Sequence, residues 1–330
     1  MFEKTRNIIF LIVLIGAIGL FSITEGPNFL SITNLQSMLF QIPEFGMLVF
    51  AIMVSVLTGG IDLSIVSTAT LSGIIAALVM IKFGSSGSSG LQEPVIIFLA
   101  VLAAIVVSVI CGSFNGILIG FMGISPILVT LGTSKLFEGI SLVLTKGEAL
   151  TGFPEVFLVL GSGTVSIIPV PFVIFLFFVL IISLFLSKTV TGFNVFMLGV
   201  NPIVARYSGI NTKLVLLKAY MLSGFFCGIA ALIIISRVNS IKVGYGSAYL
   251  LRALLVVILG GVSPSGGFGS VSGVLLGIFI LQVISSGLSI MGVNAFLRNV
   301  VWGSVLILVM ISTFLMTRFK NFRELKLTMK

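Results

Sequence analysis

Long apolar stretches separated by short polar segments occupy most of this chain. A helix needs about 20 mostly apolar residues to cross the hydrocarbon core of a bilayer. About ten stretches reach or approach that length, at residues 8–24, 37–57, 65–82, 95–120, 125–144, 168–187, 214–236, 248–262, 270–290 and 298–317. The eighth is short, so nine spans remain an alternative to ten.

The stretches fit helices better than the strands of a barrel. Barrel strands are about 10 residues long and alternate in polarity, whereas these stretches are longer and apolar on every face. A helix also satisfies its own backbone hydrogen bonds, as lipid requires. We therefore predict an all-α, polytopic integral membrane protein, with residues 1–330 forming one transmembrane domain. The first stretch is expected to be a retained helix rather than a signal peptide, because at 17 residues (8–24) it is longer than the apolar core of a signal peptide, about 7–15 residues.

Composition supports a lipid environment and excludes several kinds of chemistry. Hydrophobic residues make up 58% of the chain and charged residues only 8%, against roughly a quarter in a soluble domain. There is no histidine, and the two cysteines, Cys111 and Cys227, lie in apolar stretches without the spacing of a metal site or a disulfide framework. We expect no catalytic residue, no metal site and no cofactor.

The net charge of +9 is concentrated on one side of the predicted membrane domain. With ten spans, the two termini and the loop at about 188–213 share a side, and their charges account for the whole excess. The basic residues there are Lys4, Arg6, Lys188, Arg206, Lys213, Lys218, Arg318, Lys320, Arg323, Lys326 and Lys330, and the acidic ones are Glu3 and Glu324. The positive-inside rule places this side in the cytoplasm. A nucleic-acid partner is not expected, because the charges lie at span ends rather than in one stripe.

The segment Thr58–Ser64 (TGGIDLS) contains Asp62, the only aspartate of the chain. A carboxylate at membrane depth is costly and is usually paired, hydrated or functional. One interpretation is a broken helix that lines a translocation pathway. The other is that Asp62 caps the N-terminus of the third span. Both can hold together. Gly260-Gly261 repeats the arrangement of Gly59-Gly60, and paired interruptions of this kind are typical of transporter repeats.

A second motif, Gly199–Ile210 (GVNPIVARYSGI), predicts a short helix in the cytoplasmic loop. Asn201 is a good N-cap, Pro202 suits the first helical position, and Gly209 suits a left-handed stop. Ile203, Val204 and Tyr207 would give this helix an apolar face, with Arg206 pointing outward. Such a helix fits either a docking element for a soluble partner or a helix that lies on lipid headgroups.

A third motif, Gly260–Ser270 (GGVSPSGGFGS), resembles a phosphate-binding loop only superficially. It lacks the Gly-Lys-Ser/Thr ending and follows an apolar span rather than a soluble strand. We expect it to let two helices meet closely or turn sharply.

Isolated polar residues lie in or near the spans, and some are candidates for the pathway. They are Gln41, Glu44, Asn115, Lys135, Glu138, Arg252, Gln282 and Arg298. Lys135 and Glu138 are three residues apart on a helix and can neutralise each other. The candidate pathway residues are Gln41, Glu44, Asp62, Asn115 and Arg252. For any one of them, a hydrogen bond between helices is the favoured alternative.

Together these motifs resemble the ribose-type sugar permeases of bacterial ABC importers, a family that also includes permeases for autoinducer-2, nucleosides and branched-chain amino acids. The matching stretches are Leu57–Ser64, Phe114–Gly116, Ile124–Thr133, Gly199–Ile210 and Leu259–Ser270. They occur in the order typical of the family and span about two-thirds of the chain.

The resemblance implies a multi-pass protein of the bacterial cytoplasmic membrane that imports a sugar or sugar-like solute by alternating access. Its expected partners are membrane lipid, a cytoplasmic ATP-binding subunit, an extracytoplasmic solute-binding protein, and a second copy or a paralogue of the permease. ATP hydrolysis would belong to the partner subunit, so the chain itself is not expected to be an enzyme. The resemblance assigns ATPase coupling to Asn201, Pro202, Ala205, Arg206, Ser208 and Gly209.

Other solutes and mechanisms remain alternatives. A nucleoside, autoinducer-2 or an amino acid is the alternative solute. An ion-coupled secondary transporter is less favoured, because the spans contain few ionisable residues. Arg252 departs from the family pattern, since sugar members commonly carry an acid near this position. That difference favours an anionic or phosphorylated solute, or a specialised partner permease, over a neutral pentose.

Overall fold

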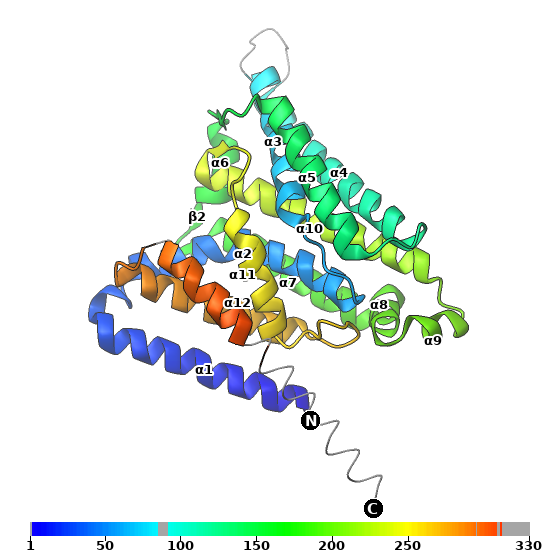
Figure 1. Ribbon diagram of the computed structural model, residues 1–330. Helices are drawn as coiled ribbons and strands as arrows, with labels where there is room; N and C mark the ends of the chain where they lie inside the picture. The colour runs from blue at the N-terminus through cyan, green and yellow to red at the C-terminus, as the bar shows by residue number, and fades with distance from the viewer. Residues whose placement is uncertain (1, 85–91, 295, 309–310, 312–330) are drawn as a thin grey trace, which may run out of the picture.

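The computed structural model describes residues 2–84, 92–294, 296–308 and 311, and these form a helical protein (Figure 1). The helices are α1 (Phe2–Glu25), η1 (Gly26–Asn28), α2 (Ile32–Leu57), α3 (Ile65–Gly84), α4 (Glu93–Gly120), α5 (Pro126–Thr145), α6 (Glu155–Ser162), α7 (Val170–Lys188), α8 (Val190–Val200), α9 (Pro202–Tyr207), α10 (Thr212–Val238), α11 (Ser247–Leu259), α12 (Val271–Ile290) and a further helix, Phe296–Leu308. The prediction of an all-α polytopic membrane protein is confirmed.

The strands in the described part of the chain are two residues long and form two antiparallel pairs. In the first pair, β1 (Leu150–Thr151) lies against β4 (Ser240–Ile241). In the second, β2 (Thr164–Val165) lies against β3 (Ile168–Pro169). These pairs satisfy backbone groups where the chain leaves its helices, and they add no sheet layer to the fold.

Eight helices in the described part of the chain are long and apolar enough to cross a membrane. They correspond to eight of the ten predicted spans. The predicted span 248–262 is the shorter helix α11, and the span 298–317 begins as helix Phe296–Leu308. Most of the rest of that span, and the charged residues from Arg318 onward, lie outside the described residues. The placement of both termini in the cytoplasm therefore stays a prediction.

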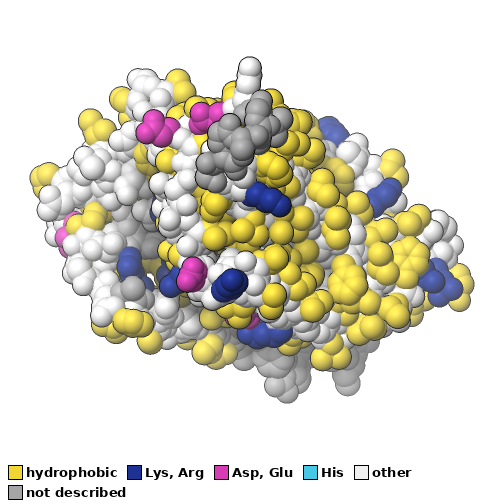
Figure 2. Space-filling model, turned by 90° about the horizontal axis from the view of Figure 1, so that it is seen from above, with side chains coloured by type: hydrophobic (Ala, Val, Ile, Leu, Met, Phe, Trp, Pro, Cys, Tyr) yellow, Lys and Arg dark blue, Asp and Glu magenta, His cyan; other side chains and the backbone are white. Residues whose placement is uncertain are grey.

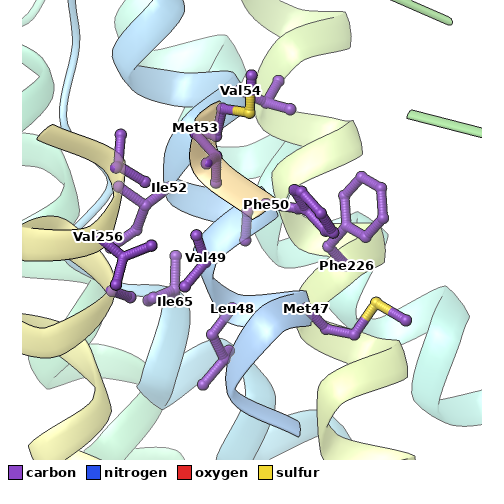
Figure 3. Close-up of a cluster of buried hydrophobic side chains, with 14 of the residues drawn as sticks. Met47, Leu48, Val49, Phe50, Ile52, Met53, Val54, Ile65, Phe226 and Val256 are labelled. Atoms are coloured by element: carbon purple, nitrogen blue, oxygen red, sulfur yellow. The ribbon is translucent and has the colours of Figure 1, made fainter. Parts of the chain in front are cut away.

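Helix α2 forms the centre of the core. Every residue from Ile42 to Leu57 is buried, so this part of the helix is enclosed on all sides. A helix that is apolar all round is expected to occupy such a position. Figure 3 shows its side chains extending toward Phe226 of α10 and toward Val256 of α11. The ring of Phe50 stacks on Phe175 of α7 with centroids 5.7 Å apart.

Helices α4 and α10 pack backbone to backbone through two glycines. A Cβ atom at Gly112 would overlap the carbonyl oxygen of Tyr220, and a Cβ atom at Gly224 would overlap the carbonyl oxygen of Ser108. Small residues allow this close approach, which supplies packing where lipid provides no hydrophobic driving force. Helix α10 therefore joins the α3–α4–α5 group to the central helix α2 (Figure 1).

We expect Gly112→Val and Gly224→Val each to destabilise the protein by about 1–3 kcal/mol or more, because the added side chain meets backbone atoms that cannot move aside. Thermal unfolding of the purified chain in detergent measures the effect. Gly16→Val is the matched control, since nothing lies within 4 Å of a Cβ at that position of α1. An equal loss of stability in all three variants would contradict this account.

Candidate functional site

Helix α11 is too short to cross the bilayer, and its first two residues, Ser247 and Ala248, are exposed. Its 13 residues measure about 20 Å at the rise of an α-helix, against a hydrocarbon core of about 30 Å. The chain reaches it from β4 through a non-helical segment that ends at Gly246, whose φ is +77° and which provides no side-chain cap. Discontinuous spans with a free helix N-terminus are typical of the substrate sites of transporters.

A cavity lined by both apolar and polar residues, called the polar cavity below for its hydroxyl and charged groups, lies beside the N-terminus of α11. It has a volume of about 180 Å³, and about 150 Å³ is enough to hold a benzene molecule. Helices α3, α5 and α11 and the segment before α11 form its walls. The lining residues are Leu63, Val66, Ser67, Thr70, Ser134, Lys135, Glu138, Val243, Gly244, Ser247 and Leu250. The cavity therefore combines the size of a small ring-shaped solute with hydroxyl groups that can bind one.

The hydroxyl groups of this cavity belong to different helices. Ser67 of α3 and Ser134 of α5 are hydrogen-bonded to each other at 2.9 Å. Thr70 lies one turn beyond Ser67, and Ser247 is the first residue of α11. Each hydroxyl can both donate and accept a hydrogen bond, which suits a solute rich in hydroxyl groups.

Lys135 marks the cavity side of α5 as a face that does not contact lipid. Its side chain is 81% exposed at the middle of the helix, and its ammonium group lies 2.8 Å from Glu138. The predicted pairing of these two residues is confirmed. A lysine in the middle of a bilayer costs about 2.5–3.5 kcal/mol by translocon-insertion scales. This face of α5 must therefore meet water or another protein subunit.

Other surfaces of the protein have the character expected of lipid contacts. Phe98 of α4 and Phe177 of α7 are 65% and 59% exposed, and they lie among other exposed apolar residues of the same helices. Seen from above, hydrophobic side chains cover much of the surface, and charged side chains cover little of it (Figure 2). The contrast separates the lipid-facing helices from the polar side of α5.

Asp62 is buried at the break between α2 and α3. Its Oδ1 atom accepts hydrogen bonds from the backbone N–H of Ser64 at 2.9 Å and from the Ser64 hydroxyl at 2.6 Å. Its Oδ2 atom accepts one from Ser223 of α10 at 2.9 Å. Ser64 directly precedes α3, so Asp62 binds one N–H group at the entry to this helix, which agrees in part with the capping interpretation.

Asn115 of α4 joins the same network, since its amide nitrogen donates to the Ser64 hydroxyl at 2.8 Å. Thr130 of α5 donates to the carbonyl of Ile61 at 3.1 Å. Asp62 and Asn115 thus come together through Ser64, in a buried network that holds α4, α5 and α10 around the break. Neither residue lines the polar cavity, and their role in the pathway stays a prediction.

The other candidate pathway residues also make contacts between helices. Glu44 of α2 accepts a hydrogen bond from the Tyr249 hydroxyl at 2.6 Å and lies 3.4 Å from the Nε atom of Arg237. Gln282 of α12 donates to Gln41 at 3.3 Å. These contacts join α2 to α10, α11 and α12, and a role for these residues in the pathway stays a prediction.

Arg252 faces away from the cavity. Its Nη2 atom donates to Asn299 in helix Phe296–Leu308, at 3.3 Å. Arg252 lies on α11, three residues after Tyr249, and does not line the cavity.

Three glycine-bearing segments meet at one end of α2. The N–H of Gly267 donates to the carbonyl of Leu57 at 3.0 Å. A Cβ atom at Gly199 would overlap that same carbonyl and the nitrogen of Gly267. Gly59, whose φ is +85°, and Gly266, whose φ is +86°, form the turns beside this contact. All three predicted motifs therefore meet here, and the expectation that the third lets elements meet closely is confirmed.

Helix α9 has the boundaries that the second motif predicts. The side-chain oxygen of Asn201 accepts hydrogen bonds from the N–H groups of Ile203 and Val204 at 2.9 and 3.1 Å. Pro202 is the first helical residue, and Gly209 has a φ of +80° beyond the end.

The surface of α9 is available to a partner. Tyr207 is 89% exposed, and Ile203, Val204, Arg206 and Ser208 are exposed with it. Ala205 is buried and holds the helix against the protein. The predicted role of these residues in ATPase coupling stays a prediction.

Sequence reasoning did not identify the hydroxyl groups of the cavity. Ser67, Thr70, Ser134 and Ser247 were not singled out, because isolated serine and threonine residues are common in membrane helices. The sequence offered one signal for this cavity. Ser67 and Thr70 are spaced to share one face of α3, and the Lys135–Glu138 pair lies on α5.

Comparison with known proteins identifies similar sequences over most of the chain. The family model for the permease component of branched-chain amino acid transport systems matches residues 34–310. The autoinducer 2 import system permease protein LsrD of Yersinia enterocolitica is 31% identical over 307 residues, covering 90% of this chain and 88% of its own length. The protein of the same name from Escherichia coli K12 is 32% identical over 287 residues, covering 84% of each chain. No solved structure matches the chain.

We expect a cysteine at position 135 to react with a charged, membrane-impermeant thiol reagent, because the side chain there faces water or a hydrated interface. Phe98→Cys on α4 is the control and should not react, since lipid excludes the charged reagent. The measurement is the labelled fraction in vesicles, with Cys111 and Cys227, both buried, replaced by alanine. Equal labelling at positions 98 and 135 would contradict the assignment of the two faces.

Proposed function

The chain belongs to the family of branched-chain amino acid transport permease components, and on that premise we propose that it forms the membrane-spanning pathway of an ABC importer for a sugar-like solute. As a member of this family it is a multi-pass ABC permease of the bacterial inner membrane, which confirms the resemblance drawn from the motifs. The solute, the mode of coupling and the partners are the proposed part.

The polar cavity beside α11 is the observation that carries the proposal. Four hydroxyl side chains and the Lys135–Glu138 pair surround about 180 Å³ within the membrane domain. Hydroxyl groups of a sugar can replace the Ser67–Ser134 hydrogen bond with bonds to the solute. The relatives named as autoinducer 2 import permeases make autoinducer 2 a specific solute to test.

Helix α9 is the proposed contact for a cytoplasmic ATP-binding subunit. It presents Tyr207, Ile203 and Arg206 to the outside, and its rigid N-terminal cap would let a push on the helix move the whole element. Exposed aromatic, arginine and aliphatic side chains are typical of protein interfaces.

The glycine contact supplies a route from α9 to the cavity. Gly199, in the last turn of α8, lies three positions before the first residue of α9 and touches Leu57 and Gly267. Leu57 ends α2, and the loop that contains Gly267 begins where α11 ends. In the proposed mechanism, ATP-driven movement of α9 shifts α11 against α3 and α5, and the cavity changes the side to which it opens. An extracytoplasmic binding protein would deliver the solute, and a second permease chain would complete the pathway.

Arg206→Glu and Gly209→Pro should each abolish copurification of the ATP-binding subunit with the permease. The first reverses a charge on the proposed contact. The second replaces a glycine whose φ of +80° proline cannot adopt. Copurification and ATP hydrolysis of the complex in lipid are the measurements.

Lys188→Glu is the control for this experiment, because it makes the same charge change at an exposed position of the same loop outside α9. Loss of the ATP-binding subunit in the control as well would remove α9 as the contact. If no ATP-binding subunit associates with the native chain, and uptake follows an ion gradient instead, the importer proposal fails.

Ser134→Leu should lower solute uptake by the reconstituted importer at least about tenfold, while the ATP-binding subunit still copurifies. The larger apolar side chain fills the cavity and removes a hydroxyl from it. Uptake of labelled autoinducer 2 and of labelled ribose is measured in parallel. Ser187→Leu at the end of α7 is the matched control, and normal uptake by Ser134→Leu would exclude the cavity as the solute site.

A further inference from the structure

The face of α11 that carries Arg252 meets a second arginine. Arg252 donates to Asn299 at 3.3 Å, and Arg298 is the neighbour of that asparagine in the same helix. Asn299 and Arg298 are consecutive, so the contact places Arg252 at the helix turn that carries the second arginine. Two helices far apart in sequence thus bring Arg252 to the turn that carries Arg298.

Neither arginine is neutralised within the described part of the chain. The Nε atoms of Arg252 and Arg298 are both buried and have no hydrogen-bond partner there. No described carboxylate lies within ion-pair distance of either group. Glu44, the buried acid of α2, is already held by Arg237 and Tyr249.

This arrangement has the chemistry of an anion site. An unpaired charge inside a membrane protein is costly, and a second like charge beside it adds to the cost. An anion placed between the two guanidinium groups offsets both of these free-energy costs. Arginine is suited to this role, because its planar fork of N–H donors matches the oxygens of a phosphate group.

We propose that Arg252 and Arg298 form a subsite for a phosphate-type oxyanion carried by the transported solute. This inference rests on the proposed function, because it assumes that the chain transports that solute. The subsite lies on the opposite side of α11 from the polar cavity, so movement of α11 changes both. A solute with hydroxyl groups and one negative group would use the two sites in turn.

Trp302 provides a direct probe of this subsite. It is the only tryptophan of the chain, it follows Arg298 by one helical turn, and it is buried with its indole N–H unpaired in the described structure. We would reconstitute the full chain in phosphatidylcholine vesicles and titrate inorganic phosphate at constant ionic strength, following the emission of Trp302. The assay needs no ATP-binding subunit, so its failure is distinguishable from failure of the importer proposal.

The expected result is a saturable change of emission with phosphate and none with chloride or ribose. Arg252→Gln and Arg298→Gln should each weaken the apparent affinity at least about tenfold. Lys188→Gln, which removes an exposed positive charge elsewhere, should leave the affinity unchanged. Absence of a saturable response in the native chain, or an equal response in all variants, would overturn the proposal.

Lipid headgroups carry the same phosphate chemistry, and a second arm separates them from a solute. The titration is repeated in vesicles that contain phosphatidylglycerol. An unchanged phosphate midpoint supports a subsite for solute. If the emission is already shifted in these vesicles and phosphate has no further effect, the headgroup fills the site and the assignment to solute is wrong.

Discussion

The contact between Leu57, Gly199 and Gly267 is the constraint that fixes α2, the segment before α9 and the loop after α11 relative to one another. Backbone meets backbone there, so any side chain at Gly199 would separate the segments. The contact joins the end of the central helix α2, the segment that leads into α9, and the loop that follows α11. In the proposed mechanism, no flexible side chain between these elements would absorb a displacement of α9, which would then reach the helices that enclose the polar cavity.

Polar groups inside this protein are placed by the requirement that lipid cannot solvate them. Asp62 accepts three hydrogen bonds from serine groups, and Asn115 extends the same network to α4. Glu44 is held between Arg237 and Tyr249. These polar residues join helices at fixed points, and that rigidity gives the break between α2 and α3 a defined shape.

Helix α11 has a different environment on each side. Ser247 and Leu250 line the polar cavity with α3 and α5, whereas Arg252 meets the helix that contains Arg298. Helix α11 covers only part of the membrane. The chain before it is not helical, and it forms one wall of the cavity. The short helix α11 therefore lies between a hydroxyl-bearing cavity and a cationic face. This arrangement suits a solute that carries both kinds of group.

The sequence alone determined the helical membrane architecture, because runs of about 20 apolar residues leave few alternatives in lipid. It also determined the local form of α9, since Asn201, Pro202 and Gly209 act within one short segment. Pairing between helices was decided only by the tertiary structure. Glu44 with Arg237, Arg252 with Asn299, and Ser67 with Ser134 are far apart along the chain. Such spans are apolar on nearly every face, so the hydrophobic pattern does not specify which faces meet. The glycine contacts and the buried polar groups select the faces that pack together.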